Sequence, residues 1–318
     1  MNNASLPAPK QKDKIIIEDP QARKRRMKKY LTAYAIISPW LIGFLAFIVG
    51  PMLASLYLSF TSYDLLSGAE WIGVQNYVQL FTNDPRFINA IKVTLVFVML
   101  SVPLKLAFAL FLAFLFNTGR KGSSIFTTVY YIPSIIGGSV AIAVVWRRMF
   151  GSDGAINAFL ERFGVEPVSW VMHPDHALSV LILLIIWQFG SPMIIFLAGL
   201  RQIPSDLYEA ASVDGAGALR QFTHITIPML TPVIFFNLVM QTIGSFMTFT
   251  QVYLITEGGP MERTNLIAVY IYRTAFEFLK MGYASAMAWV VLLIIAVITL
   301  LLFLSAKYWV HYEAEGGR

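Results

Sequence analysis

The sequence has no cysteine among its 318 residues. This absence excludes disulfide bonds, thiolate metal sites and cysteine nucleophiles together. Charged residues are also scarce, at 13% of the chain, whereas about a quarter is usual in soluble domains. The sequence contains no glycine-rich phosphate-binding loop ending in Gly-Lys-Ser or Gly-Lys-Thr, so we do not expect this chain to bind a nucleotide through such a loop.

Hydrophobic residues make up 57% of the chain, and the mean hydropathy is +0.65. One globular core of this size could not hide so many apolar side chains, so lipid must cover the surplus. Six apolar segments each approach the length of about 20 residues that a helix needs to cross the hydrocarbon layer. The sequence therefore predicts an all-α integral membrane protein with six transmembrane helices, at about 33–60, 91–116, 125–150, 177–200, 225–250 and 284–306.

Basic residues are concentrated near the N-terminus, where nine lysines and arginines lie between Lys10 and Lys29. A basic cluster directly before an apolar run is typical of a cytoplasmic tail in contact with anionic headgroups, and we expect no nucleic-acid partner. Residues 1–29 are thus predicted to be an irregular cytoplasmic tail, and residues 30–308 a six-helix domain. An even number of spans also places residues 309–318 in the cytoplasm.

The loops between the predicted spans alternate in charge. The short loop with Arg120 and Lys121 carries no acid and falls inside, as the positive-inside rule expects. The loop 151–176 has four acidic residues against one arginine and falls outside. The loop 201–224 falls inside.

The loop 201–224 and the residues that follow it carry the most informative motif. Ser205 is suited to cap a helix that runs through Glu209-Ala210-Ala211. Asp214-Gly215 ends that helix, because glycine accepts the left-handed conformation of a turn. A second short helix then leads to Ile227-Pro228 and the fifth span. The pattern predicts a compact helix–turn–helix that serves as a docking site for another protein, and the alternative is an ordinary interhelical turn.

This stretch resembles the signature loop of ABC importer permeases, which carries Glu-Ala-Ala, then Gly, then Ile-x-Leu-Pro. In that family the loop sits in a cleft of the ATPase subunit and transmits its closure to the membrane helices. The resemblance implies that Glu209 meets a basic group on the ATPase and that Gly215 allows the bend. One departure is Ile227, which stands where leucine is commoner.

Three further segments resemble landmarks of carbohydrate permeases of the maltose and oligosaccharide type. They are residues 71–77, Gly258-Gly259-Pro260 and 270–286. The resemblance implies a sugar permease of the bacterial plasma membrane that moves its substrate by alternating access and is not itself an enzyme. The implied partners are a second, homologous permease, two ATPase subunits that bind ATP and magnesium, and an extracytoplasmic sugar-binding protein. This chain is expected to bind no cofactor.

There are two alternatives to a sugar permease. A permease for another solute, such as a peptide, phosphate or a polyamine, is compatible with the loop 201–224 alone. A membrane-embedded enzyme or an ion-coupled transporter usually places carboxylates or histidines inside its spans. None occurs in the six predicted spans.

A substrate path is suggested by polar residues that recur on the fifth predicted span at steps of four, four, three and three: Asn237, Gln241, Ser245, Thr248 and Gln251. At about 100° per residue they would share one helix face about 120° wide. Hydroxyls and amides pair with sugar hydroxyls in either direction, although they could instead join helices to one another. Trp187 and Gln188 on the fourth span could add a stacking face and an amide, and the alternative is that they simply pack within the bundle.

Lys105 is the one charge deep within a predicted span. A central lysine costs at least ~2.5 kcal/mol on insertion scales, so something should compensate for it. One hypothesis is that Lys105 faces the substrate path and favours acidic saccharides; the alternative is that it reaches a backbone carbonyl or a wet crevice. His173 and His176 lack further ligands nearby in the sequence, so we expect neither a metal site nor catalytic residues.

Overall fold

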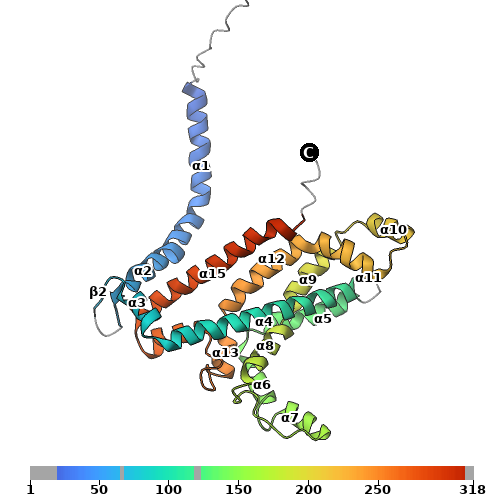
Figure 1. The fold of residues 1–318 in the computed structure, drawn as a ribbon. Coiled ribbons are helices and arrows are strands. Elements are labelled where there is room, and N and C mark those ends of the chain that lie inside the picture. Colours follow the sequence, from blue (N-terminus) through green and yellow to red (C-terminus); the bar gives the residue numbers. More distant parts are fainter. Residues whose placement is uncertain (1–19, 65–67, 118–122, 312–318) are drawn as a thin grey trace, which may run out of the picture. The chain divides into compact units, whose positions relative to one another are not determined.

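The computed structural model describes residues 20–64, 68–117 and 123–311, and the chain divides into two compact units, residues 1–55 and 56–318 (Figure 1). The described residues are almost entirely helical. Their two short strands, β1 Thr61–Ser62 and β2 Glu70–Trp71, form one antiparallel pair. The predicted all-α class is therefore confirmed. Arg120, Lys121 and most of the two predicted tails lie outside the described residues.

The first unit is one long helical segment. It comprises α1 Pro20–Phe44, the π-helix η1 Leu45–Val49 and the start of α2 Gly50–Ser59, whose last turn belongs to the second unit. The helix begins at Pro20, so the final part of the predicted irregular tail is helical instead. Proline suits the first position of a helix, and the lysines and arginines after it are good helix formers.

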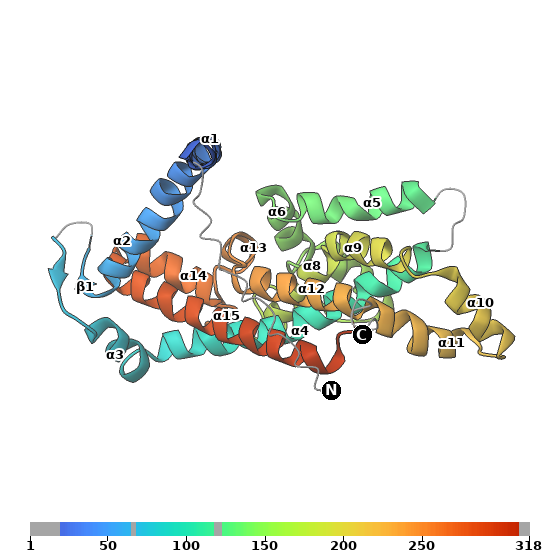
Figure 2. The same ribbon diagram turned by 90° about the horizontal axis from the view of Figure 1, so that it is seen from above.

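Three continuous helices form the long spans of the second unit. They are α4 Pro85–Phe116, α12 Ile227–Phe246 and α15 Met281–Trp309, and α12 lies beside both others (Figure 2). The short helix α11 Ala218–Gln221 and the π-helix η3 Phe222–Thr226 lead into α12 without a break. Helix α4 starts six residues before the predicted residue 91, because Asp84 caps it by accepting a hydrogen bond from the Phe87 amide at 2.9 Å.

The third and fourth predicted spans are broken rather than continuous. Helices α5 Ser123–Ile136 and α6 Val140–Met149 meet at a bend of 95°. Helices α8 Ala177–Trp187 and α9 Gly190–Leu200 meet at a bend of 43°. The described residues thus hold four helices long and apolar enough to cross a membrane, or six spans if each bent pair is one span.

A serine from α5 repairs the break between α8 and α9. The Ser134 hydroxyl donates to the Gln188 carbonyl at 3.0 Å and accepts from the Ser191 amide at 3.0 Å. Breaks at membrane depth are tolerated where neighbouring side chains satisfy the freed backbone groups in this way. Gly190 lets α5 approach, since a Cβ there would lie 2.8 Å from the Tyr131 Cα. The break is therefore held by packing between two spans (Figure 2).

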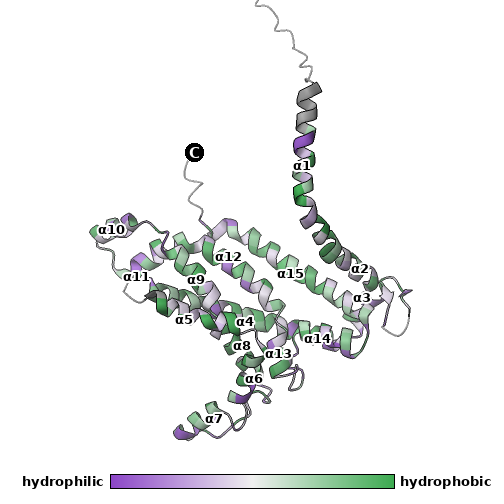
Figure 3. Ribbon diagram, turned by 180° about the vertical axis from the view of Figure 1, so that it is seen from behind, coloured by the Kyte–Doolittle hydropathy of each residue, from purple (hydrophilic) through white to green (hydrophobic). Residues whose placement is uncertain are grey.

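The remaining elements are short and connect the spans: α3 Gln75–Thr82, α7 Ala155–Leu160, the 3-10 helix η2 Glu161–Phe163, α10 Ser205–Val213, α13 Thr250–Ile255, α14 Ile267–Tyr272 and the π-helix η4 Arg273–Glu277. The largest buried cluster includes Phe97 of α4, Leu184 of α8 and Phe196 of α9. Figure 3 shows hydrophobic colouring along α12 and α15 and hydrophilic patches on α7 and α11.

Candidate functional site

A cavity of about 350 Å³ lies where both helix breaks meet the end of α12. It gathers six of the eight residues proposed from the sequence for the substrate path: Lys105, Gln188, Gln241, Ser245, Thr248 and Gln251. Five segments supply these side chains, namely α4, the α8–α9 break, the C-terminal part of α12, the turn after α12, and α13. Residues separated by up to 146 positions therefore converge on one space (251 − 105).

The sequence predicted that the polar residues share one face of a single helix, but the structure brings them together in a different way. Helix α12 ends at Phe246, so Thr248 and Gln251 do not continue its face, and the predicted fifth span is too long at its C-terminal end. The chain turns through Met247–Phe249 and resumes as α13. Gln251 is held at this position because its Nε2 donates to the Gly137 carbonyl, at 3.4 Å, in the α5–α6 break. The two residues reach the cavity through a turn, which helical spacing does not describe.

Two of the proposed residues lie outside the cavity lining. Asn237 is fully buried and donates its Nδ2 to the Val233 carbonyl at 3.2 Å, within α12. The Trp187 ring packs on Trp146 at a centroid distance of 5.6 Å. Trp187 therefore packs within the bundle, which is the alternative given for it above, whereas the hydrogen bond of Asn237 stays within α12 and does not join two helices.

Lys105 lines the cavity from α4 and is half-buried there. Within the described part of the chain, no hydrogen bond or ion pair joins its ammonium group to another residue. The other described residues of the lining are uncharged: they are amides, hydroxyls, glycines and three apolar side chains, so the ammonium is the only formal charge among them. A cation placed among uncharged hydrogen-bonding groups suits a ligand that is polar and either neutral or anionic.

The second predicted site is an elbow, which we define as residues Ser205–Thr226. Helix α10 ends at Asp214, Gly215 takes the left-handed φ of +76°, and α11 follows. The predicted turn at Asp214-Gly215 is thus confirmed. Ser205 is not the cap: Pro204 occupies that position, and the Ser205 hydroxyl donates to Asp206 at 3.4 Å. Glu209, Ala210 and Asp214 are exposed, Ala211 is half-buried, and the half-buried Ile227 and Pro228 begin α12.

Comparison with known proteins decides the family. The family model of the binding-protein-dependent transport system inner membrane component matches residues 85–310. The chain belongs to this family. The permease is thus a multi-pass membrane protein and a transport component, and its resemblance to ABC importer permeases is confirmed.

Individual relatives cover nearly the whole permease. A protein described as a probable ABC transporter permease, YesP of Bacillus subtilis (strain 168), is 54% identical over 301 residues, covering 93% of this chain and 97% of the relative. The lactose transport system permease protein LacF of Rhizobium radiobacter is 34% identical over 291 residues, covering 88% and 96%. A chain of a bacterial alginate ABC transporter, crystallised with an alginate pentasaccharide-bound periplasmic protein, matches with a TM-score of 0.78 at 27% identity, covering 89% and 96%.

Two hydrogen-bonded pairs hold the elbow of the permease in shape, and sequence reasoning missed both. Gln221 donates to the Ser212 hydroxyl at 2.9 Å and to the Ala216 carbonyl at 3.1 Å, which closes the turn. The Tyr208 and Thr226 hydroxyls lie 2.9 Å apart and join α10 to η3. At the same time Val213 and Leu219 are 89% and 78% exposed. A stiff element with exposed apolar side chains is suited to contact another protein.

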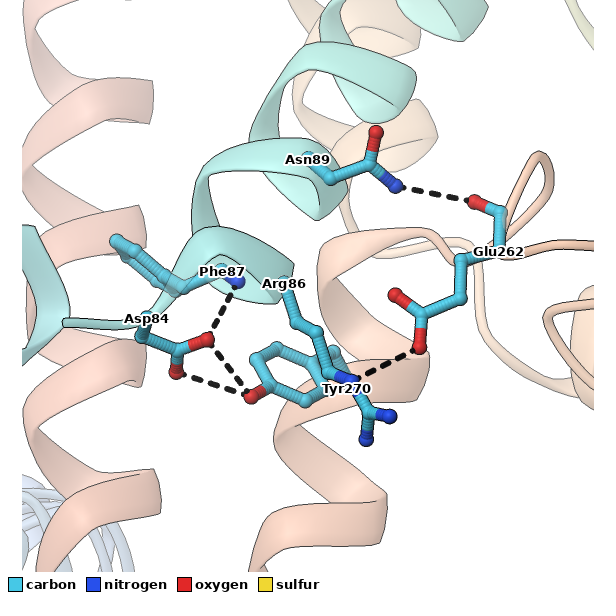
Figure 4. A network of polar contacts seen from close by, with 6 residues as sticks. All are labelled: Asp84, Arg86, Phe87, Asn89, Glu262 and Tyr270. Atoms are coloured by element: carbon cyan, nitrogen blue, oxygen red, sulfur yellow. Dashed lines mark hydrogen bonds and ion pairs between the residues drawn. The ribbon is translucent and has the colours of Figure 1, made fainter.

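At the N-terminal end of α4, away from the elbow, the permease has a polar cluster that we call the α4 tether: Asp84 and Tyr283, which are half-buried, and Tyr270, which is buried. The Asp84 carboxylate accepts from the Tyr270 hydroxyl at 2.9 Å, besides capping α4 (Figure 4). It also accepts from the Tyr283 hydroxyl at 2.8 Å. Burial, and then the hydrogen bond to Asp84, raise the pKa of Tyr270. The tether thereby joins the start of α4 to α14 and α15.

Further contacts join the first turns of α4 to residues 262–267. Arg86 pairs with Glu262 at 3.2 Å, and the Asn89 amide donates to the Glu262 carbonyl at 3.2 Å (Figure 4). Thr94, one turn further along α4, accepts a hydrogen bond from the Ile267 amide at 2.8 Å. No sequence signal distinguishes these residues, since their partners lie about 170 positions away.

Proposed function

We propose that the permease forms half of the membrane pore of an ATP-driven importer for sugars or oligosaccharides. The observation that carries this proposal is the cavity, where amides and hydroxyls from four segments meet at the breaks of two spans. Such groups pair with sugar hydroxyls as donors or acceptors. Binding sites at discontinuous helices are common in membrane transporters, because the breaks free polar groups that a continuous helix keeps bonded.

The substrate class is supported by the relatives and by the landmarks of the sequence. LacF is named for lactose transport, and the alginate transporter was crystallised with a pentasaccharide-bound protein. Residues 71–77 and Gly258-Gly259-Pro260 resemble carbohydrate permeases as well. These observations favour a saccharide over the peptides or polyamines that the elbow motif alone would permit.

The elbow is the proposed contact with the ATPase. Glu209 offers an exposed carboxylate for a basic group, and Gly215 permits the turn that presents it. Closure of two ATPase subunits, which bind ATP and magnesium, would move two elbows together and switch the cavity between the two sides of the membrane. A second permease supplies the other elbow, and an extracytoplasmic binding protein delivers the sugar. In this arrangement both termini of the chain lie in the cytoplasm.

The test is reconstitution of the complete transporter in proteoliposomes, with ATP hydrolysis measured as saccharide-loaded binding proteins are added. Stimulation by one loaded binding protein, together with uptake of its labelled saccharide, is the expected result. If ATP hydrolysis is stimulated only by a binding protein loaded with a peptide, phosphate or a polyamine, then that solute, and not a sugar, is the substrate. ATP hydrolysis that never responds to a binding protein, with no crosslink from Glu209 to an ATPase, would refute the proposal.

Lys105 supports a finer proposal, namely selection of acidic saccharides. In the Lys105→Met variant, the uptake of a uronate-containing oligosaccharide should fall at least tenfold, about 1.4 kcal/mol, while uptake of a neutral one changes little. The physical reason is loss of the only formal charge in the lining. Lys92→Met is the matched control, because Lys92 lies on the same helix but is exposed. Equal loss of both substrates in Lys105→Met would refute charge selection and leave sugar transport intact.

A further inference from the structure

One buried glycine lies between two of the glutamines that line the cavity. Gly137 is in the turn between α5 and α6, and it is buried although the two residues after it are exposed. It lies against both Gln188 and Gln251, which are 51 (188 − 137) and 114 positions further along the chain. Sequence reasoning assigned no role to Gly137, because neither neighbour is close to it in the sequence.

The Gln188 side chain packs on Gly137 at the place where any other residue would carry its Cβ. A Cβ at position 137 would lie 2.5 Å from the Gln188 Cδ and closer still to its Cγ. It would also lie 2.5 Å from the Pro133 carbonyl oxygen. The backbone of Gln188 is already held from the same helix, by the Ser134 hydroxyl. Because packed atoms cannot approach so closely, an added Cβ must displace either the Gln188 side chain or the turn that carries Gly137.

The carbonyl group of the same glycine holds the second glutamine. It accepts the hydrogen bond from the Gln251 Nε2 at 3.4 Å, which joins the turn to α13, and α13 packs against α6 (Figure 2). The Gly137 amide donates to the Pro133 carbonyl at 2.8 Å and closes the last turn of α5. Any shift of this turn would therefore move the acceptor on which the position of Gln251 depends.

The hydrogen bonds of the two glutamines also determine which end of each amide is left for a ligand. A carbonyl oxygen can only accept, so the amide nitrogen of a glutamine that bonds to it must point toward it. Gln251 points its nitrogen toward Gly137, and Gln188 points its nitrogen toward the Leu184 carbonyl at 3.3 Å. Among the described residues, no hydrogen bond engages the Oε1 atom of either glutamine. Both side chains therefore keep an acceptor for a ligand in the cavity.

Two fixed acceptors in one cavity suit a ligand with several hydroxyl groups. Gln188 and Gln251 line the same space as Lys105. A saccharide can donate its hydroxyl hydrogens to the amide oxygens while its own oxygens accept from the ammonium group. A site built to accept a hydroxyl hydrogen discriminates against an analogue that cannot donate one, because the acceptor then loses its partner. The positions of the two oxygens would therefore determine which hydroxyls of a sugar are recognised.

We propose that Gly137 is a positioning residue of the sugar path, which fixes Gln188 by the absence of a side chain and Gln251 by its carbonyl group. The specificity that follows is for saccharides whose hydroxyls donate to the two amide oxygens. This inference rests on the proposed function, in which the cavity binds a saccharide. Gly137 acts through the two glutamines and does not itself bind the sugar.

The experiment uses the reconstituted transporter and the saccharide whose loaded binding protein supports uptake by the wild type. The probes are that saccharide and its analogues in which fluorine, which cannot donate a hydrogen bond, replaces one hydroxyl. The wild type should take up the saccharide at least fivefold faster than one or more of the analogues, and Gly137→Ala should lose most of this preference. The binding protein is the same in every assay, so its own preference among the probes cannot produce a difference between variants.

Gly151→Ala is the matched control and should keep the preference. Gly151 lies just beyond the other end of α6, and a Cβ there would meet only an ordinary contact at 3.4 Å. An unchanged preference in Gly137→Ala, or the absence of any preference in the wild type, would overturn the proposal.

Two further variants decide the matter even if Gly137→Ala is too unstable to assay. Gly137→Ala/Gln188→Ala removes the Cγ and Cδ atoms that the added Cβ would meet, so it should unfold at a higher temperature in detergent than Gly137→Ala. No gain in stability would show that Gly137 does not serve to admit Gln188, and the proposal would fail. Gln251→Met keeps the length of the side chain but removes the acceptor, so it should lose the preference for at least one hydroxyl; a full preference would also refute the proposal. If the wild type takes up no saccharide, the proposed function itself fails, so the two failures are distinguishable.

Discussion

The two ends of the membrane domain are built in opposite ways. The elbow is exposed, carries Val213 and Leu219 on its surface, and is held by two small hydrogen-bonded groups around Gln221 and Tyr208. The residues of the α4 tether are buried or half-buried, and one carboxylate there accepts from two tyrosines and a helix end. The elbow thus leaves apolar side chains on the surface, whereas the polar groups of the tether bind one another within the chain.

This difference assigns separate tasks to the two ends. A force applied at the elbow reaches α12 through α11 and η3, which continue into it without a break. At the far end, the tether keeps α4, α14 and α15 together, so that they respond as one body. Substitutions at the tether should therefore lower stability, and substitutions at the elbow should lower coupling while leaving stability almost unchanged.

The largest expected effect is at the tether. Asp84→Ala removes the α4 cap, worth about 1 kcal/mol, and leaves the buried Tyr270 hydroxyl unpaired, which costs about 1–3 kcal/mol more. Thermal unfolding of the purified permease in detergent should shift down by several degrees. Asp84→Asn is the matched variant, because its amide oxygen can still accept a hydrogen bond, and it should lose less. Equal losses in both variants would contradict the role of the acceptor.

The elbow gives the next effect, seen in transport rather than in unfolding. Gly215→Val forces a β-branched residue into a left-handed backbone that such residues rarely adopt, although open space surrounds the position. Uptake by the reconstituted transporter should fall more than tenfold, about 1.4 kcal/mol. Gly217→Ala provides the control, since Gly217 has an ordinary φ of −70° and open space for a Cβ. Similar uptake by the two variants would show that the turn is not needed.

A smaller effect separates the stiffness of the elbow from its shape. Tyr208→Phe removes the hydroxyl that pairs with Thr226 and keeps the ring. One such hydrogen bond contributes about 1 kcal/mol, so uptake should fall only a fewfold and unfolding should barely change. Thr223→Val is the comparison, because the Thr223 hydroxyl bonds only to its neighbours within the same turn. A larger loss of uptake in Thr223→Val than in Tyr208→Phe would show that other contacts in η3, and not the Tyr208–Thr226 pair, are the ones that coupling requires.

The features of the fold that the sequence predicts correctly are those with a local signal. Apolar runs of span length predicted where the membrane helices lie, and Asp214-Gly215 predicted the turn, because hydropathy and glycine φ preference act within a few residues. The breaks at Gly137–Ser139 and Gln188–Phe189 were not predicted, although glycine and serine lie at or beside both, because the apolar runs that contain them still have the length of a span. The break after Gln188 is repaired by Ser134, which is 54 positions away.

At the cavity, the spacing of polar residues in the sequence identified several lining residues, but the reason it gave for their proximity is only partly correct. The even spacing of polar residues predicted a single helix face, yet the structure brings Thr248 and Gln251 in through a turn after Phe246. The same spacing included Asn237, which is buried away from the cavity. Spacing along a helix cannot reveal where that helix ends when the residues beyond it, Met247 and Phe249, are as apolar as those within it.

The smallest effect tests whether charge alone contributes at the tether. The Arg86–Glu262 pair lies above it, with side chains 62% and 37% exposed. Exposed pairs of this kind contribute about 0–1 kcal/mol, because water and salt screen them. Arg86→Met should therefore shift thermal unfolding far less than Asp84→Ala, and added salt should remove the remaining difference from wild type. The Asn89 amide still binds the Glu262 carbonyl in this variant, so the loop keeps its position. A shift as large as that of Asp84→Ala would mean that the exposed pair, and not the covered carboxylate, joins α4 to the loop before α14.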